Sequence, residues 1–140
     1  MTVHPQLCRD THSLGRFERS VVLLHRNAIV PWFILVPETS ETEFLALDPG
    51  LSTELLDESA RTARFVQAYF GSPKINFAAI GNIVPQLHLH VVGRAPGDCC
   101  WPNPVWGHLV DSTPYKNSDV AAIARSMIRD CDLKPADPGL

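Results

Sequence analysis

Polar and apolar residues alternate over positions 86–91, and this alternation constrains the fold more than any other feature of the chain. In a β-strand, residues two positions apart share a face. Gln86, His88 and His90 are therefore expected to project together, while the apolar residues between them point into the core. With a rise of about 3.3 Å per residue, the backbones of the two histidines would lie roughly 6.7 Å apart. Both rings could then reach one phosphate-sized or metal-sized ligand.

Short apolar runs elsewhere in the chain predict the neighbouring strands. Residues 20–24 and 32–36 are rich in β-branched and apolar side chains and are separated by a polar break, which suggests an antiparallel pair joined by a loop. Residues 75–80 predict a third strand, and the alternating segment 86–92 predicts a fourth. Residues 1–16 lack a regular pattern and are expected to form an irregular arm or an edge segment.

Apolar residues at spacings of three and four predict two helices. The longer helix covers residues 52–70, with Ser52 or Thr53 as its N-cap and Gly71 as its left-handed end. The shorter helix covers residues 118–131 and is capped by its first residue.

The order of these elements predicts an α+β fold, with a mostly antiparallel sheet of about five strands, one long helix packed on it and a C-terminal helix. A length of 140 residues suits a single domain over positions 1–140. Four prolines and two tryptophans in residues 94–115 predict a long loop held by its aromatic side chains. Residues 134–140 are expected to fray.

Composition excludes several classes of protein. A net charge of −3 argues against a coat for nucleic-acid polymers, which needs a surplus of Lys and Arg. The N-terminus has no apolar run of signal-peptide length, and no stretch approaches the roughly 20 apolar residues of a membrane span. We therefore expect a cytoplasmic protein with no membrane partner. The four cysteines show no regular spacing and are expected to be reduced, incidental thiols.

The alternating pattern alone leaves three interpretations of its polar face open. It could be an ordinary half-exposed strand. It could hold a divalent metal between the two histidines, with Cys99, Cys100 or His108 as a third ligand. It could also carry phosphate chemistry, in which a neutral imidazole attacks phosphorus while neighbouring donors hold the non-bridging oxygens.

Residues 86–92 resemble the signature of the histidine triad superfamily, His-φ-His-φ-His-φ-φ with φ an apolar residue, except that Gln86 stands at the first histidine. The likeness extends over about residues 21–106. It includes an apolar strand that ends in Pro37 and the pair Trp101-Pro102. The chain is most similar to a bacterial subgroup that carries glutamine at the first position.

The resemblance implies a homodimer that binds a small nucleotide substrate and hydrolyses or transfers nucleotidyl groups through a covalent nucleotidyl-histidine. By position, His88 would be the nucleophile, with no cofactor and no metal needed for the covalent step. His90 would contact the phosphate and, when protonated, stabilise developing charge. Gln86 could replace the missing histidine only as a hydrogen-bonding group, because an amide transfers no proton near neutral pH.

The resemblance also implies a nucleotide-binding role for three asparagines. Asn27 would face the ribose, and Asn76 and Asn82 would orient the phosphate, although each could equally close a turn. His25 has no partner in the sequence and is expected at the surface, and the tryptophans are expected to be core or dimer anchors. The rival functions are a non-catalytic nucleotide-binding or scaffold protein and the metal site.

Overall fold

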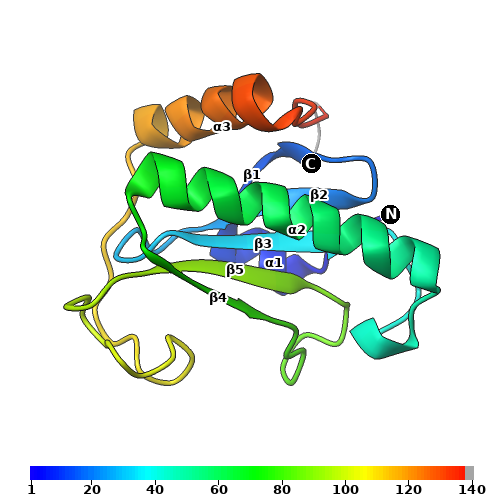
Figure 1. The fold of residues 1–140 in the computed structure, drawn as a ribbon, viewed down its shortest axis with the longest axis horizontal. Coiled ribbons are helices and arrows are strands. Elements are labelled where there is room, and N and C mark those ends of the chain that lie inside the picture. Colours follow the sequence, from blue (N-terminus) through cyan, green and yellow to red (C-terminus); the bar gives the residue numbers. More distant parts are fainter. Residues whose placement is uncertain (138–140) are drawn as a thin grey trace.

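A five-stranded sheet with helices on both faces forms the fold, and all of its strand pairs are antiparallel, with the order β1-β2-β3-β5-β4 (Figure 1). The structure is a computed structural model and describes residues 1–137. In chain order the elements are α1 (Pro5–Asp10), β1 (Thr11–Arg16), β2 (Ser20–His25), β3 (Trp32–Pro37), a 3₁₀ turn η1 (Phe44–Ala46), α2 (Pro49–Phe70), β4 (Lys74–Ala78), β5 (Leu89–Arg94) and α3 (Asn117–Cys131). This architecture confirms the predicted α+β class.

Helices α2 and α3 cover one face of the sheet, in front of it in Figure 1. Leu89 and Val91 of β5 and Phe33 of β3 point to this face, where they pack with Val66 of α2 and Met127 of α3. The predicted inward direction of Leu89 and Val91 is therefore confirmed, and His90 between them must face the other way.

The N-terminal segment covers the opposite face, with α1 behind the sheet in Figure 1. Val3 and Leu7 are buried there beside Trp32, Ile34 and Val92. The first residues were expected to be an irregular arm or an edge segment. They form a short helix followed by β1, which is an edge strand of the sheet.

Helix α2 begins three residues before the predicted N-cap. Asp48 is the cap, and its carboxylate accepts a hydrogen bond from the Gly50 backbone N–H at 3.0 Å. The prediction of Ser52 or Thr53 was wrong because Pro49 fits the first helical position, where no N–H is needed. The helix ends as predicted, at Gly71 with φ of 68°.

The predicted fraying of the tail is wrong at Lys134. Its backbone N–H and C=O each bond with Arg16 of β1 at 2.9 Å, so the chain after α3 is tied to the edge strand. The rest of that prediction, over residues 138–140, lies outside the described residues. Helix α3 starts at Asn117, with Lys116 rather than its serine as the N-cap. Within residues 1–137, no helix is long and apolar enough to cross a membrane.

Strand β5 starts at Leu89, three residues later than the alternation predicts. Its pairing with β3 ends at Leu35 opposite Leu89, and its pairing with β4 ends at Ala78 opposite His90. Residues 86–88 therefore precede the paired part of β5, beyond the end of β4 and unpaired with the last residues of β3. The rule that every second residue shares a face applies only within the paired part.

Gly93 allows α2 to lie close to β5, which gives a test of this packing. A Cβ at position 93 would overlap the Ser72 hydroxyl and lie 2.7 Å from a methyl group of Val66. We expect Gly93→Ala to lower the free energy of unfolding by about 1–3 kcal/mol, the usual cost of overpacking, measured by urea denaturation.

Gly50→Ala is the matched control, because its new Cβ would meet only Asp48 oxygens at 3.7 Å. A helical Gly→Ala change of this kind should be neutral or stabilise by up to about 1 kcal/mol. Equal stability of the two variants would contradict the close packing at Gly93.

Candidate functional site

His88 and His90 lie together at the start of β5, on the face opposite α2. Their ring centroids are 4.8 Å apart, and the residues are 7% and 6% exposed. They open into a pocket of about 420 Å³. The pocket is lined by Gln6, Leu7, Asp10, His25, Trp32, Ile34, Ile80, Gly81, Asn82, Ile83, Val84, His88, His90 and Trp106. The structure thus brings the two predicted histidines into one largely apolar pocket.

The proton of His90 is placed by Trp32. The indole Nε1–H of Trp32 donates to Nδ1 of His90 at 3.0 Å. An indole nitrogen can only donate, so Nδ1 is the unprotonated nitrogen and the neutral ring carries its hydrogen on Nε2. Burial, followed by the nearby His88 and His25, lowers the pKa of His90 to about 3. The predicted role of a protonated His90 is therefore corrected, because this ring is a neutral donor at pH 7.

His88 has the opposite tautomer. Its Nδ1 lies 2.7 Å from the backbone carbonyl oxygen of Gln86. A carbonyl oxygen can only accept, so Nδ1 must carry the hydrogen and donate it. The lone pair of the neutral ring then resides on Nε2, which is the atom a nucleophilic imidazole uses.

The side chain of Gln86 does not join the histidines, so the predicted shared face is wrong for this residue. Its Oε1 accepts from the His4 backbone N–H at 2.8 Å, and its Nε2 donates to the Thr2 carbonyl at 3.1 Å. The amide is thus bonded to the N-terminal segment. The physical reason is that position 86 precedes the paired part of β5, where the strand rule for side-chain direction does not hold.

Of the three asparagines, only Asn82 lines the pocket. The Asn27 side chain joins the β2–β3 turn to a later loop by donating to the Asp111 carbonyl and accepting from the Thr113 N–H, at 2.8 and 3.1 Å. The Asn76 oxygen accepts from Arg94 at 3.0 Å. The geometry therefore does not bring Asn27 or Asn76 to the histidines, because both amides serve contacts between segments of this chain.

Sequence reasoning missed several pocket residues. His25, expected at the surface, stacks on Trp32 with ring centroids 4.5 Å apart, and burial lowers its pKa. The pairing of β2 with β3 indicates this contact. Leu24 lies opposite Phe33, so the next residues along the two strands, His25 and Trp32, also lie opposite each other. Trp106 of the long loop lies 5.2 Å from the His90 ring. No sequence pattern indicated that α1 would form a wall of the pocket.

Arg94 holds the first part of that loop. The residue is only 1% exposed and its guanidinium donates to both carboxylate oxygens of Asp98, at 2.8 and 3.0 Å. It also donates to Asn76 and to the Asn103 carbonyl, and it lies 5.6 Å from the Trp101 ring. The Arg94 guanidinium lowers the pKa of the Asp98 carboxyl to about 2. Arg94 therefore organises the chain that leads to Trp106.

In the described part of the chain, no three His, Cys, Asp or Glu side chains form a group that could hold a metal ion. The third ligands considered from sequence lie apart from the histidine pair. Cys100 accepts a hydrogen bond from Arg94, and His108 bonds to the Trp106 carbonyl. The residues present do not fit a metal site.

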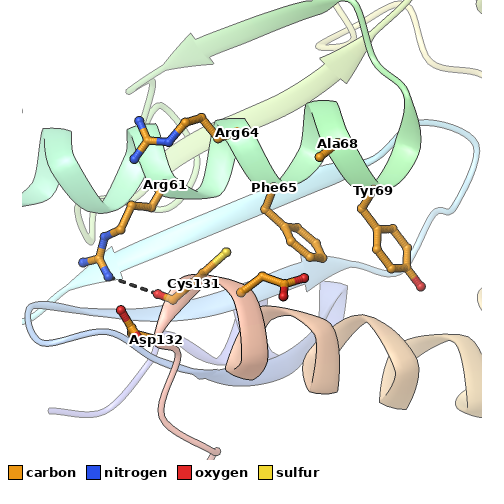
Figure 2. A pocket seen from close by; sticks show the side chains of 8 residues that line it. Arg61, Arg64, Phe65, Ala68, Tyr69, Cys131 and Asp132 are labelled. Carbon is orange, nitrogen blue, oxygen red and sulfur yellow. Dashed lines mark hydrogen bonds between the residues drawn. The ribbon is translucent and has the colours of Figure 1, made fainter.

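A second cavity, of about 550 Å³, lies between α2 and the end of α3, on the other face of the sheet (Figure 2). Arg61 lines it but is already bonded to the Asp57 carboxylate and the Cys131 carbonyl, both at 3.1 Å. Arg64 shares the lining with two aspartates, Asp132 and Asp130, and the carboxylate of Asp130 is paired with Arg129 at 2.8 Å. None of the site residues predicted from sequence lines this cavity.

The comparisons with known proteins decide the family. The family model of the HIT domain matches residues 7–97, which include both histidines and the whole sheet.

The chain belongs to the histidine triad (HIT) family.

Three solved HIT structures resemble this HIT protein closely. A histidine triad protein from Marinobacter aquaeolei is 38% identical with a TM-score of 0.86, and the match covers 94% of this chain and 97% of that one. Those from Bradyrhizobium japonicum and Sinorhizobium meliloti are 34% and 33% identical, with TM-scores of 0.85 and 0.86, and each match covers 92% of this chain and 96% of the other. The comparison with curated proteins gives no match. Membership of the HIT family supports a nucleotide-binding function.

The lowered pKa of His90 predicts a loss of stability in mild acid. Below the ordinary histidine pKa of about 6.5, the unfolded chain binds a proton at this residue and the folded chain does not, until the pH approaches 3. Stability therefore falls as the pH falls through this window. At pH 5 the loss from His90 should be about 2 kcal/mol, measured by urea unfolding at pH 7 and pH 5.

His90→Asn is the comparison variant, because an asparagine oxygen can still accept from Trp32 but does not titrate. Its acid loss should be smaller by about the same 2 kcal/mol. A smaller loss remains, since the pKa values of His25 and His12 are also lowered. Equal losses in wild type and variant would contradict the inferred titration of His90.

Proposed function

We propose that this HIT protein hydrolyses or transfers nucleotidyl groups, cleaving a nucleoside monophosphate from an ester, anhydride or phosphoramidate. The observation that carries the proposal is the opposite tautomers of two adjacent histidines. His88 presents a lone pair at Nε2, and His90 presents an N–H at Nε2. A phosphoryl group needs both an attacking atom and a donor to its non-bridging oxygens.

In the first step, Nε2 of His88 attacks the phosphorus atom of the substrate. The N–P bond forms while the bond from phosphorus to the leaving oxygen or nitrogen breaks, and the leaving group takes its proton from solvent. The Gln86 carbonyl supports this step by orienting the ring and by accepting from Nδ1–H as the imidazole gains positive charge. The product is a nucleotidyl group on His88.

His90 stabilises charge on the phosphoryl oxygens and does not transfer a proton. Its Nε2–H, fixed by the bond from Trp32 to Nδ1, donates to a non-bridging oxygen as charge builds up there. A donor of fixed direction in a pocket lined by Trp32 and Trp106 needs little reorganisation. This role does not require a protonated ring.

In the second step, water or another acceptor attacks phosphorus and the N–P bond breaks. His88 recovers its lone pair, and the nucleoside monophosphate leaves as the free acid or on the acceptor. The apolar wall formed by Trp32, Ile34 and Ile80 suits the nucleoside part of the substrate, with Asn82 at the rim.

We also propose that the protein is a homodimer, as the family resemblance implies. The strand β4 is an edge of the sheet and leaves Phe77 46% exposed. An apolar edge strand of this kind supports pairing with a second copy. The rival function is a nucleotide-binding protein of the same fold that performs no chemistry.

Labelling of His88 tests the mechanism. After incubation with adenosine phosphoramidate labelled in the adenosine, and quenching in alkali, wild-type protein should carry label on His88. His88→Asn should abolish the label, since an amide cannot attack phosphorus. His90→Ala, which has no donor at this position, should slow labelling roughly a hundredfold, the usual effect of removing one donor to a developing oxyanion.

His12→Asn is the control, because His12 lies on β1 next to Arg26 and outside the pocket. It should label at the wild-type rate. Thermal stabilisation of the wild type by nucleotide, with no label on His88 under any condition, would favour the non-catalytic binder and refute the proposed chemistry.

A further inference from the structure

The side chain of Gln86 makes two hydrogen bonds that connect the chain just before β5 to the N-terminal segment. Its amide oxygen accepts from the His4 N–H at 2.8 Å and its amide nitrogen donates to the Thr2 carbonyl at 3.1 Å. These two backbone groups flank Val3, and they are the pair that a neighbouring strand would use in a parallel ladder. The glutamine side chain therefore takes the place of a strand partner for residues 2–4.

This connection depends on the shape of an amide. The oxygen and nitrogen of a planar amide lie side by side, so they can meet a C=O and an N–H on one edge of an extended chain. The two nitrogens of an imidazole diverge and cannot reach both groups together. Gln86 thus performs a task that a histidine at this position could not.

The segment held by Gln86 forms part of the nucleotide pocket. Val3, 4% exposed, and Leu7, 5% exposed, are buried in the cluster that contains Trp32 and Ile34. Gln6, Leu7 and Asp10 of α1 line the pocket that holds His88. Loss of the anchor at residues 2–4 would therefore loosen one wall of the pocket without touching the histidines.

We propose that Gln86 is a positioning residue that fastens the N-terminal segment over the sheet, so that α1 forms the pocket wall that determines nucleotide affinity. The kinetic effect expected from this proposal rests on the proposed function, whereas the two hydrogen bonds of Gln86 do not depend on it. Gln86 then contributes to substrate binding and not to proton transfer.

Two variants remove the connection from opposite sides. Gln86→Ala removes both hydrogen bonds. His4→Pro removes the backbone N–H, and so one of the two hydrogen bonds, together with the imidazole; the φ of −55° at His4 already suits proline. His4→Ala is the matched control: like His4→Pro it loses the imidazole that accepts from the Gln6 N–H, but it keeps its own backbone N–H.

Hydrogen exchange and kinetics give separate measurements. In Gln86→Ala and His4→Pro, amide hydrogens of residues 2–10 should exchange faster than in His4→Ala. The KM for adenosine phosphoramidate should rise roughly tenfold in Gln86→Ala and less in His4→Pro, as expected for the loss of two bonds and of one. The rate of His88 labelling at saturating substrate should stay within about twofold of wild type in Gln86→Ala, because alanine keeps the backbone carbonyl that accepts from His88 Nδ1. The double variant Gln86→Ala/His4→Pro should have the same KM as Gln86→Ala/His4→Ala, because the connection is already lost in both.

The proposal would be overturned if Gln86→Ala labelled more slowly at saturating substrate while its KM and the hydrogen exchange of residues 2–10 stayed unchanged. The Gln86 side chain would then act in the chemical step. If wild type shows no label, the proposed function fails by itself, and binding of AMP measured by calorimetry decides the present proposal. Weaker AMP binding with faster exchange in Gln86→Ala supports it, and unchanged binding with unchanged exchange refutes it.

Discussion

The antiparallel pairing of β3 with β5 is the constraint on which the site depends. Every residue of β5 is buried, so a slip of one residue would turn His90 into the core under α2. In the observed register Ile34 lies opposite His90, and Trp32 is its diagonal neighbour, within reach of a long aromatic side chain. One cross-strand register therefore places the histidine, its hydrogen-bond donor and an apolar wall of the pocket together.

The two histidines differ because of their local partners. His90 accepts from an indole that can only donate, whereas His88 donates to a carbonyl that can only accept. The first partner comes from the neighbouring strand and the second from the chain just before β5. The fold thus supplies an attacking nitrogen and a neutral donor side by side.

The sequence allowed prediction of features that depend on local pattern. The β2–β3 pair, the long helix with its end at Gly71, and the burial of Leu89 and Val91 were all predicted correctly. The direction of Gln86 was not, because the period of two applies only where a strand is paired. The contacts of Asn27 also escaped prediction, since they join the β2–β3 turn to a loop far along the chain. His25 was missed although the β2–β3 pairing places it opposite Trp32.

Arg94 has a consequence for how sequences related to this one can diverge. Its guanidinium keeps its charge at any physiological pH and is 1% exposed, with Asp98 as its carboxylate partner. Removing one member of a buried ion pair commonly costs about 3–5 kcal/mol, whereas replacing both by apolar residues can be neutral. Arg94 and Asp98 are thus expected to be inherited as a unit, kept together or lost together. Substitutions at the exposed positions around them in the loop are expected to be tolerated.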